Sequence, residues 1–299
     1  MTTHAIHLHN SKPRRLMGLI PSGGQHWVGD GFHVSSVIHP QMDQSILSPF
    51  LLLDHAAPKS FGPAKKRRGV GEHPHRGFET VTFAYQGEVE HRDSAGGGGR
   101  IGPGDVQWMT AASGLVHEEM QSQKFTEKGG TFEMVQLWVN LRAAHKMDEP
   151  SYQGLLDADF PRVNLGAARA RLVAGTLGEV QGPAKTRSPM TVFDLRFEAE
   201  GESKFEFPKG WTTLVYPLEG SLSLGPGKVA LPSQTMAVFE ANDEGYVQLY
   251  GQTSVRALVL AGEPLHESVA AHGPFVMNTQ DELVKAFEDY RSGRMGRLG

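Results

Sequence analysis

The sequence contains no cysteine among its 299 residues. This absence excludes disulfide bonds, thiolate metal sites and cysteine nucleophiles. Any metal ion bound by this chain must therefore be held by histidine, carboxylate or water.

Long apolar runs are also missing. No stretch approaches the roughly 18 apolar residues of a membrane-spanning helix. The opening MTTHAIHLHNSKPRRL lacks the apolar core of a signal peptide. We therefore expect a cytoplasmic protein that does not enter a membrane.

Neither sign of charge is in large excess, because the formal net charge is -4. This balance gives no general electrostatic attraction to nucleic acid or to an anionic membrane, so direct DNA binding is not expected. One local basic stretch, KKRRG at Lys65–Gly69, is the exception. Such charge runs are usually solvated loops, and we favour that interpretation over a binding patch.

Glycine and proline, in contrast, are abundant, with 36 and 18 residues. With 39% hydrophobic and 21% charged residues, the composition is typical of a globular chain with many turns and short strands. The length suits about two ordinary domains. We predict an all-β protein.

The order of short alternating segments predicts two β domains. From residue 15 to about 141, apolar and alternating runs are separated by glycine, proline and aspartate, as in antiparallel strands. Residues 142–164 are polar and less periodic, and a second β-rich segment spans 171–262. We place the domains at 1–145 and 146–299.

The two β-rich segments resemble each other. ETVTFAYQGEVE and GPGDVQWMTA, within 79–111, are echoed by TTLVYPLEGSLSLGPGKVALPSQTMAVFEA at 212–241, with strands, a glycine-centred turn and a Gly-Pro-Gly turn in the same order. This pattern indicates a duplicated barrel. Near the end, Thr279 and Glu282 form a capping box, and apolar residues recur at helical spacing up to Gly293. We expect a C-terminal helix that packs on one barrel.

Two short motifs offer metal ligands. Residues two apart on a strand share a face, so His73 and His75 in GEHPHRGFET present two imidazoles together. In SGLVHEEMQ, His117 and Glu119 share a face in the same way, and Glu118 points away. If these strands face each other across a barrel interior, the three nitrogens and one oxygen can hold one divalent ion with open positions.

Several longer motifs resemble the pirins, a family within the cupins: HPHRGFETV, EHRDS, PGDVQWMTA, GLVHEEM, VQLWVNL, HGPFVMNT and DYRSGRMG. The match to the general cupin pattern is looser, because Ala112 and Gln121 stand where proline and asparagine are usual. The resemblance implies a bicupin fold of two double-stranded β-helix (jelly-roll) barrels. It also implies metal ligation by His73, His75, His117 and Glu119 in the N-terminal barrel, and no metal in the second barrel.

Other polar residues leave alternatives open. On an unbroken strand Glu79 would share the face of His73 and His75, so it is either a further ligand or, as we favour, a group that orients a histidine. His91, Arg92 and Asp93 in EHRDS either line the cavity mouth or support a ligand or, as we favour, form a hydrogen-bonded turn cluster. The N-terminal histidines could mimic a chelating strand, but no carboxylate arm accompanies them: His4, His7 and His9.

The resemblance also implies an activity. Some pirin-like proteins resemble flavonol 2,3-dioxygenases, so we expect a metal-dependent dioxygenase that takes a small aromatic, flavonol-like substrate and dioxygen, with Glu119 as ligand and base. Iron(II) is favoured by the resemblance, and the donor set also accepts Mn, Co, Ni, Cu or Zn.

The alternative function is an iron-dependent, redox-responsive regulator that acts through a protein partner. A third possibility is a metal-stabilised fold without activity. We expect a monomer.

Overall fold

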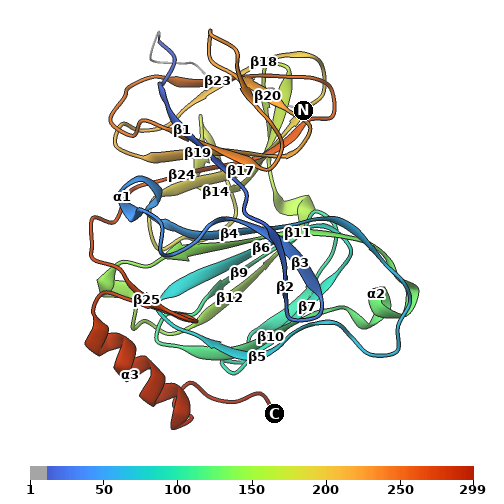
Figure 1. Ribbon diagram of the computed structural model, residues 1–299, viewed down its shortest axis with the longest axis vertical. Coiled ribbons are helices and arrows are strands. Elements are labelled where there is room, and N and C mark those ends of the chain that lie inside the picture. Colours follow the sequence, from blue (N-terminus) through green and yellow to red (C-terminus); the bar gives the residue numbers. More distant parts are fainter. Residues whose placement is uncertain (1–11) are drawn as a thin grey trace. The chain divides into compact units, whose positions relative to one another are not determined.

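The computed structural model describes residues 12–299, which divide into two compact β-rich units (Figure 1). We name the unit that contains the predicted metal motifs the first barrel; it comprises Gly23–Gln44, Pro49–Asp157 and Leu265–Gly299. The second barrel comprises 12–22, Ser45–Ser48 and Ala158–Pro264.

The first barrel consists of a seven-stranded and a four-stranded antiparallel sheet. The larger sheet contains, in spatial order, β12 (Ser151–Leu155), β9 (Val106–Thr110), β6 (Phe78–Gln86), β11 (Gly130–Asn140), β4 (Phe50–Phe61), β3 (Phe32–Ile38) and β2 (Gln25–Val28). The smaller sheet contains β5 (Gly69–His75), β10 (Leu115–Gln121), β7 (Val89–Asp93) and β8 (Gly98–Ile101). Phe83, Trp108 and Met109 are fully buried in this barrel.

The second barrel repeats this arrangement of seven and four strands. Its larger sheet contains β1 (Leu16–Pro21), β22 (Thr235–Phe239), β19 (Thr212–Glu219), β24 (Arg256–Gly262), β17 (Met190–Phe197), β14 (Ala168–Ala174) and β13 (Arg162–Leu165). The smaller sheet contains β18 (Gly201–Glu206), β23 (Tyr246–Gly251), β20 (Leu222–Leu224) and β21 (Val229–Leu231). Because β9-β6-β11-β4 matches β22-β19-β24-β17 in order, the predicted duplication agrees with the topology.

The remaining elements are short, apart from one helix. They are α1 (Gln44–Leu47), α2 (Gln123–Lys128), two 3-10 turns (Ala143–His145 and Asp157–Asp159), and the hairpins β15 (Thr176–Leu177) with β16 (Val180–Gln181) and β25 (Ala270–His272) with β26 (Phe275–Met277). The predicted C-terminal helix is α3 (Gln280–Arg291). Across 12–299, no helix combines the length and apolar character needed to cross a membrane.

The structure divides the chain differently from the boundary predicted near residue 145. Strand β1 pairs with β22 of the second barrel, and β12 pairs with β9 of the first. Each repeat therefore gives its leading strand to the sheet of the other repeat. The final segment, Leu265–Gly299, also belongs to the first barrel rather than the second. The strand pattern indicated the β-rich segments but did not identify which strands pair, since edge strands carry no signal for a particular ladder.

The C-terminal segment is bound to the first barrel through α3. The predicted capping box is present, because the Thr279 side chain accepts from the Glu282 N–H and the Glu282 side chain accepts from the Thr279 N–H. Leu283 and Ala286 are buried on the side of α3 that packs near β25 and β26 (Figure 1). This packing brings the β25–β26 turn next to the end of β5.

Candidate metal centre

The two histidine motifs lie on neighbouring strands of one sheet. Strands β5 and β10 pair antiparallel, with His117 opposite His73 and Leu115 opposite His75. One ligand atom from each of His73, His75 and His117 lies within 4.8 Å of the others. The two motifs do not face each other across the barrel interior but meet by direct strand pairing, which fixes their spacing through the backbone ladder.

Each of the three histidines is engaged at Nδ1. His73 Nδ1 lies 2.7 Å from Gly71 O, and His75 Nδ1 lies 3.3 Å from Pro274 O. A carbonyl oxygen only accepts, so Nδ1 must donate in each of these two rings. In the neutral form of such a ring, Nε2 carries no proton. Both Nε2 atoms therefore have a free lone pair, as metal ligation requires.

His117 provides a direct test of whether a metal fits. Its Nδ1 lies 3.3 Å from His91 Nδ1, and its Nε2 is buried without a hydrogen-bond partner in the part of the chain that the structure describes. A buried polar atom without a partner is costly, and a metal ion would satisfy it. The donor set therefore fits a divalent ion of the first transition series.

The electrostatics of the cluster favour neutral imidazoles. Burial lowers the pKa of His117 well below its usual range, and the neighbouring histidines lower it further. Burial likewise lowers the pKa of His75, with His73 as the next largest cause. Since only the neutral ring binds a metal, these side chains are prepared for ligation at neutral pH.

Glu119 lies beside the histidine cluster but outside it. A register shift in the β5–β10 ladder follows His117, so Glu119 pairs with Val70. Its Oε1 accepts hydrogen bonds from Gln107 Nε2 at 2.5 Å and Thr82 Oγ1 at 3.1 Å. The shared face predicted from the sequence is consistent with this position, and ligation by Glu119 stays a prediction. Glu118 points away, as predicted, toward Arg92.

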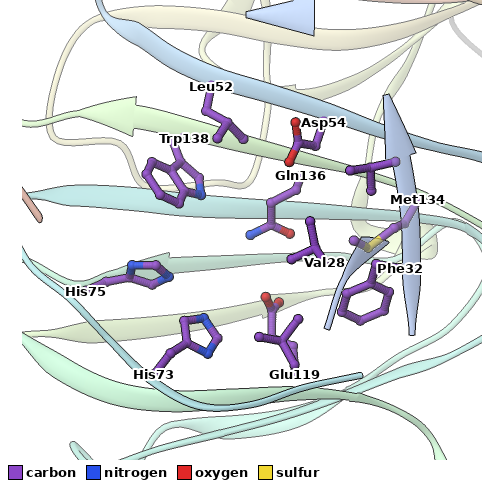
Figure 2. Close-up of a pocket in the computed structure, with 12 residues that line it drawn as sticks. Val28, Phe32, Leu52, Asp54, His73, His75, Glu119, Met134, Gln136 and Trp138 are labelled. Carbon is purple, nitrogen blue, oxygen red and sulfur yellow. The ribbon is translucent and has the colours of Figure 1, made fainter. Parts of the chain in front are cut away.

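A cavity of about 160 Å³, open to solvent, extends from His73, His75 and Glu119 (Figure 2). Its other lining residues are largely apolar: Val28, Phe32, Val34, Leu52, Val70, Met134 and Trp138, together with Asp54 and Gln136. Burial raises the pKa of Asp54, although the hydrogen bond that its carboxyl accepts from Ser36 partly opposes this. No sequence pattern singled out Asp54 or Gln136.

The structure separates Glu79 from the two histidines of β5. Strand β5 ends at His75, Gly77 with φ of +88° lies between the strands, and Glu79 is on β6 in the larger sheet. A common face for Glu79 and the two histidines requires one unbroken strand. Because the strand is broken, the spacing of these residues does not place them on one face. Glu79 accepts from Thr110 Oγ1 at 2.6 Å and is not part of the histidine cluster.

The EHRDS motif forms a strand next to the site rather than a turn cluster. His91 and Asp93 are buried on β7, and Arg92 is exposed between them. His91 Nε2 lies 3.0 Å from Asp93 Oδ2. Burial raises the pKa of Asp93, but hydrogen bonds from His91 and the Gly97 N–H outweigh it and lower the pKa overall. The alternation of buried and exposed residues was the signal that could have identified His91.

The sequence also drew attention to the N-terminal histidines and to the basic stretch KKRRG. His4, His7 and His9 lie outside the described residues. In KKRRG, Lys65 and Lys66 are not buried, while Arg67 forms an ion pair with Glu90 at 2.9 Å.

Comparisons with known proteins agree with this architecture. The family model named Pirin matches residues 31–139, and that of the pirin C-terminal cupin domain matches 192–296. A Pseudomonas aeruginosa protein provisionally named quercetin 2,3-dioxygenase is 50% identical over 95% of this chain and 99% of its own length. Pirin of Homo sapiens is 35% identical over 84% of this chain and 83% of its own.

Among solved structures, a quercetin 2,3-dioxygenase from Acinetobacter baumannii superposes with a TM-score of 0.91. It is 43% identical in sequence, and the match covers 96% of this chain and 100% of the other. The similarity therefore extends over both barrels.

Proposed function

Because this chain belongs to the pirin family of bicupin proteins, we propose that it is a mononuclear metal protein that cleaves flavonols with dioxygen. The observation that carries the proposal is the cluster of three histidines, each engaged at Nδ1 and with Nε2 left for a metal, beside a largely apolar cavity. The names of the Pseudomonas and Acinetobacter relatives support the reaction class.

The protein residues divide the work around the metal. A divalent ion bound by His73, His75 and His117, with iron favoured, would supply Lewis-acid and redox chemistry at the cavity end. Glu119 is the nearby carboxylate, and it would take the proton of the substrate hydroxyl and could also join the ligand set. Gln107 and Thr82 hold its Oε1 and so keep the carboxylate oriented.

The cavity walls suit a flat aromatic substrate. Trp138 lies next to His75, with ring centroids 5.2 Å apart, and Phe32 and Met134 lie farther along the cavity (Figure 2). Apolar walls exclude water from the reacting group and hold the ring system. Asp54 also lines the cavity, and its carboxyl can accept a hydrogen bond from a phenolic hydroxyl.

Dioxygen uptake with quercetin tests the proposal. The proteins to compare are iron-reconstituted wild type, His117→Ala and Glu119→Ala, each with measured metal content. Glu118→Ala is the matched control, because it lies on the same strand with its side chain directed toward Arg92. We expect uptake with the wild type and Glu118→Ala and none with His117→Ala, which should also lose metal.

The absence of turnover in a fully metal-loaded wild type would contradict the dioxygenase. That result would favour the redox-responsive regulator, for which the accessible lysines of KKRRG, Lys65 and Lys66, are the surface to examine. Capture of a protein partner by the iron(II) and iron(III) forms would then be the next experiment.

A further inference from the structure

A line of three buried side chains leads away from the candidate metal centre. His117, His91 and Asp93 have exposed fractions of 0%, 4% and 8%. His117 Nδ1 lies 3.3 Å from His91 Nδ1, and His91 Nε2 lies 3.0 Å from Asp93 Oδ2. His117 is thus the histidine of the cluster whose outer partner is another imidazole rather than a carbonyl.

The proton positions along this line follow from its far end. Asp93 Oδ1 accepts from the N–H groups of Ala95 and Gly97, both at 2.9 Å. The remaining oxygen, Oδ2, faces His91 Nε2, which must then donate. In a neutral ring the other nitrogen of His91 is an acceptor, so His117 Nδ1 must donate to it. His117 Nε2 is left without a proton.

We propose that His91 and Asp93 are positioning residues of the metal centre, which fix the tautomer and the ring plane of His117 so that its Nε2 is available to the metal. Outer partners of this kind typically control metal affinity about 10-fold to 100-fold. The inference rests on the proposed metal site and is independent of flavonol cleavage.

Tyr152 holds the middle of the line in place. Its ring stacks on His91, with centroids 4.9 Å apart and planes 14° from parallel. Tyr152 belongs to β12, the strand that pairs with β9 at the sheet edge. The stacking restricts rotation of the His91 ring, so both of its nitrogens stay aligned with His117 and Asp93.

Asp93→Asn is the sharpest test, because the variant is nearly isosteric. Two backbone N–H groups require an acceptor at Oδ1, so the new amide would direct its NH2 group at His91 Nε2. His91 would then accept at Nε2 and donate from Nδ1 to His117 Nδ1. The proton of the neutral His117 ring would therefore move to Nε2. We expect ¹⁵N NMR of the metal-free protein to show this change of tautomer, and Co²⁺ alone to bind at least about 10-fold more weakly.

A pair of variants at residue 91 separates positioning from packing. His91→Gln keeps an acceptor for His117 and a donor for Asp93, whereas His91→Phe keeps only the stacking on Tyr152. We expect Co²⁺ affinity to be largely retained in the first variant and reduced about 10-fold or more in the second. Tyr152→Phe, which retains the ring, is the control and should preserve the His117 tautomer.

Two results would overturn the inference. One is equal Co²⁺ affinity in His91→Gln and His91→Phe. The other is a wild-type, metal-free protein in which ¹⁵N shifts place the His117 proton on Nε2. Because the tautomer is read without metal and without flavonol, neither result depends on whether the protein is a dioxygenase. Circular dichroism melting of each variant identifies any that fail to fold.

Discussion

The side chains around the candidate metal centre are oriented by partners from several parts of the chain. Gly71 contacts His73 from the same strand, whereas Pro274 contacts His75 from a segment almost 200 residues away in sequence. Glu119 depends on Gln107, which lies on β9. The orientations of His75 and Glu119 therefore depend on partners distant in sequence, whereas that of His73 depends on its own strand.

At the scale of single residues, the hydrogen bond between Gln107 and Glu119 gives a testable prediction. Gln107 is fully buried, so Gln107→Leu leaves the buried Glu119 carboxylate with one hydrogen-bond donor fewer. We expect the free energy of unfolding to fall by about 1–3 kcal/mol in urea denaturation. Gln123→Leu, at an exposed position of α2, is the control and should stay within about 0.5 kcal/mol. A loss no larger than the control would show that the carboxylate is adequately held without Gln107.

Lys146 gives a prediction of pH dependence. Its Nζ is buried and donates to Gly77 O, Asn140 Oδ1 and Val276 O. Burial lowers the pKa of Lys146 to about 7, although Glu267 and Glu282 oppose the shift. Between pH 7 and roughly 10.4 the unfolded chain therefore holds a proton that the folded protein has released, so stability should rise with pH.

The expected increase approaches about 1.4 kcal/mol per pH unit for this single group. Urea unfolding at pH 7, 8 and 9 measures it, and Lys146→Met should remove this part of the slope. If the two slopes are equal, the three oxygen acceptors keep the ammonium charged in the folded protein.

The clustering of the three histidines could be predicted from sequence, but most of their partners could not. The alternation in HPH and HEE is local, and it identified His73, His75 and His117 as a group and placed Glu119 beside them. Asp54 and Gln136 reach the cavity from strands whose pairing is not visible in a short motif. The alternative that Glu79 shares the face of His73 and His75 required one unbroken strand, and the chain is interrupted at Gly77.

At the scale of elements, α3 is attached to the first barrel by a buried ion pair. Arg76 Nη1 lies 2.9 Å from Asp289 Oδ2, with exposed side-chain fractions of 5% and 9%. Burial raises the pKa of Asp289, but hydrogen bonds from Lys285, Arg76 and Arg294 lower it well below the usual range. Asp289 is therefore charged at any ordinary pH and neutralises a buried guanidinium.

Removal of the Asp289 charge should loosen this helix from the barrel. We expect Asp289→Asn to lower the free energy of unfolding by about 3–5 kcal/mol, because Arg76 remains buried without its counterion. Thr279→Ala, which removes only the helix cap, should cost about 1 kcal/mol. Urea denaturation of both variants compares them, and equal losses would mean that the ion pair contributes no more than a cap.

The strands and the C-terminal helix were themselves predictable, because their signals are local. The capping box at Thr279 and Glu282 is present as predicted. The Gly-Pro-Gly segment before β9 includes Gly104, which has φ of +93° and forms the predicted turn. Elements are encoded by neighbours in sequence, so a single sequence is enough to find them.

For the whole molecule, the partners of β1 and β12 were beyond prediction. Leu16 pairs with Phe239, and Ser151 pairs with Thr110. Both strands are short edge strands with weak alternation, and nothing in their sequence distinguishes one barrel from the other. The choice depends on which sheet edge lies within reach of the folded chain.

Separate halves of the protein should therefore fail to fold. A fragment of residues 1–145 lacks β12 and the segment with Pro274, and a fragment of 146–299 lacks β1. We expect each fragment alone to show no cooperative thermal transition by circular dichroism, and 1–145 to bind no Co²⁺. A mixture refolded together should recover both properties. Cooperative melting and full metal binding by 1–145 alone would contradict the exchange of strands.

The reciprocal placement of β1 and β12 also bears on the history of the chain. A tandem duplication normally leaves two copies that could each fold as a separate protein if the gene were split. When each copy supplies a strand to the sheet of the other, splitting the gene gives two proteins that each lack a strand. The two copies can then no longer separate without loss of a sheet edge. Selection for the histidine-bearing barrel then also maintains the second barrel, whatever that barrel itself binds.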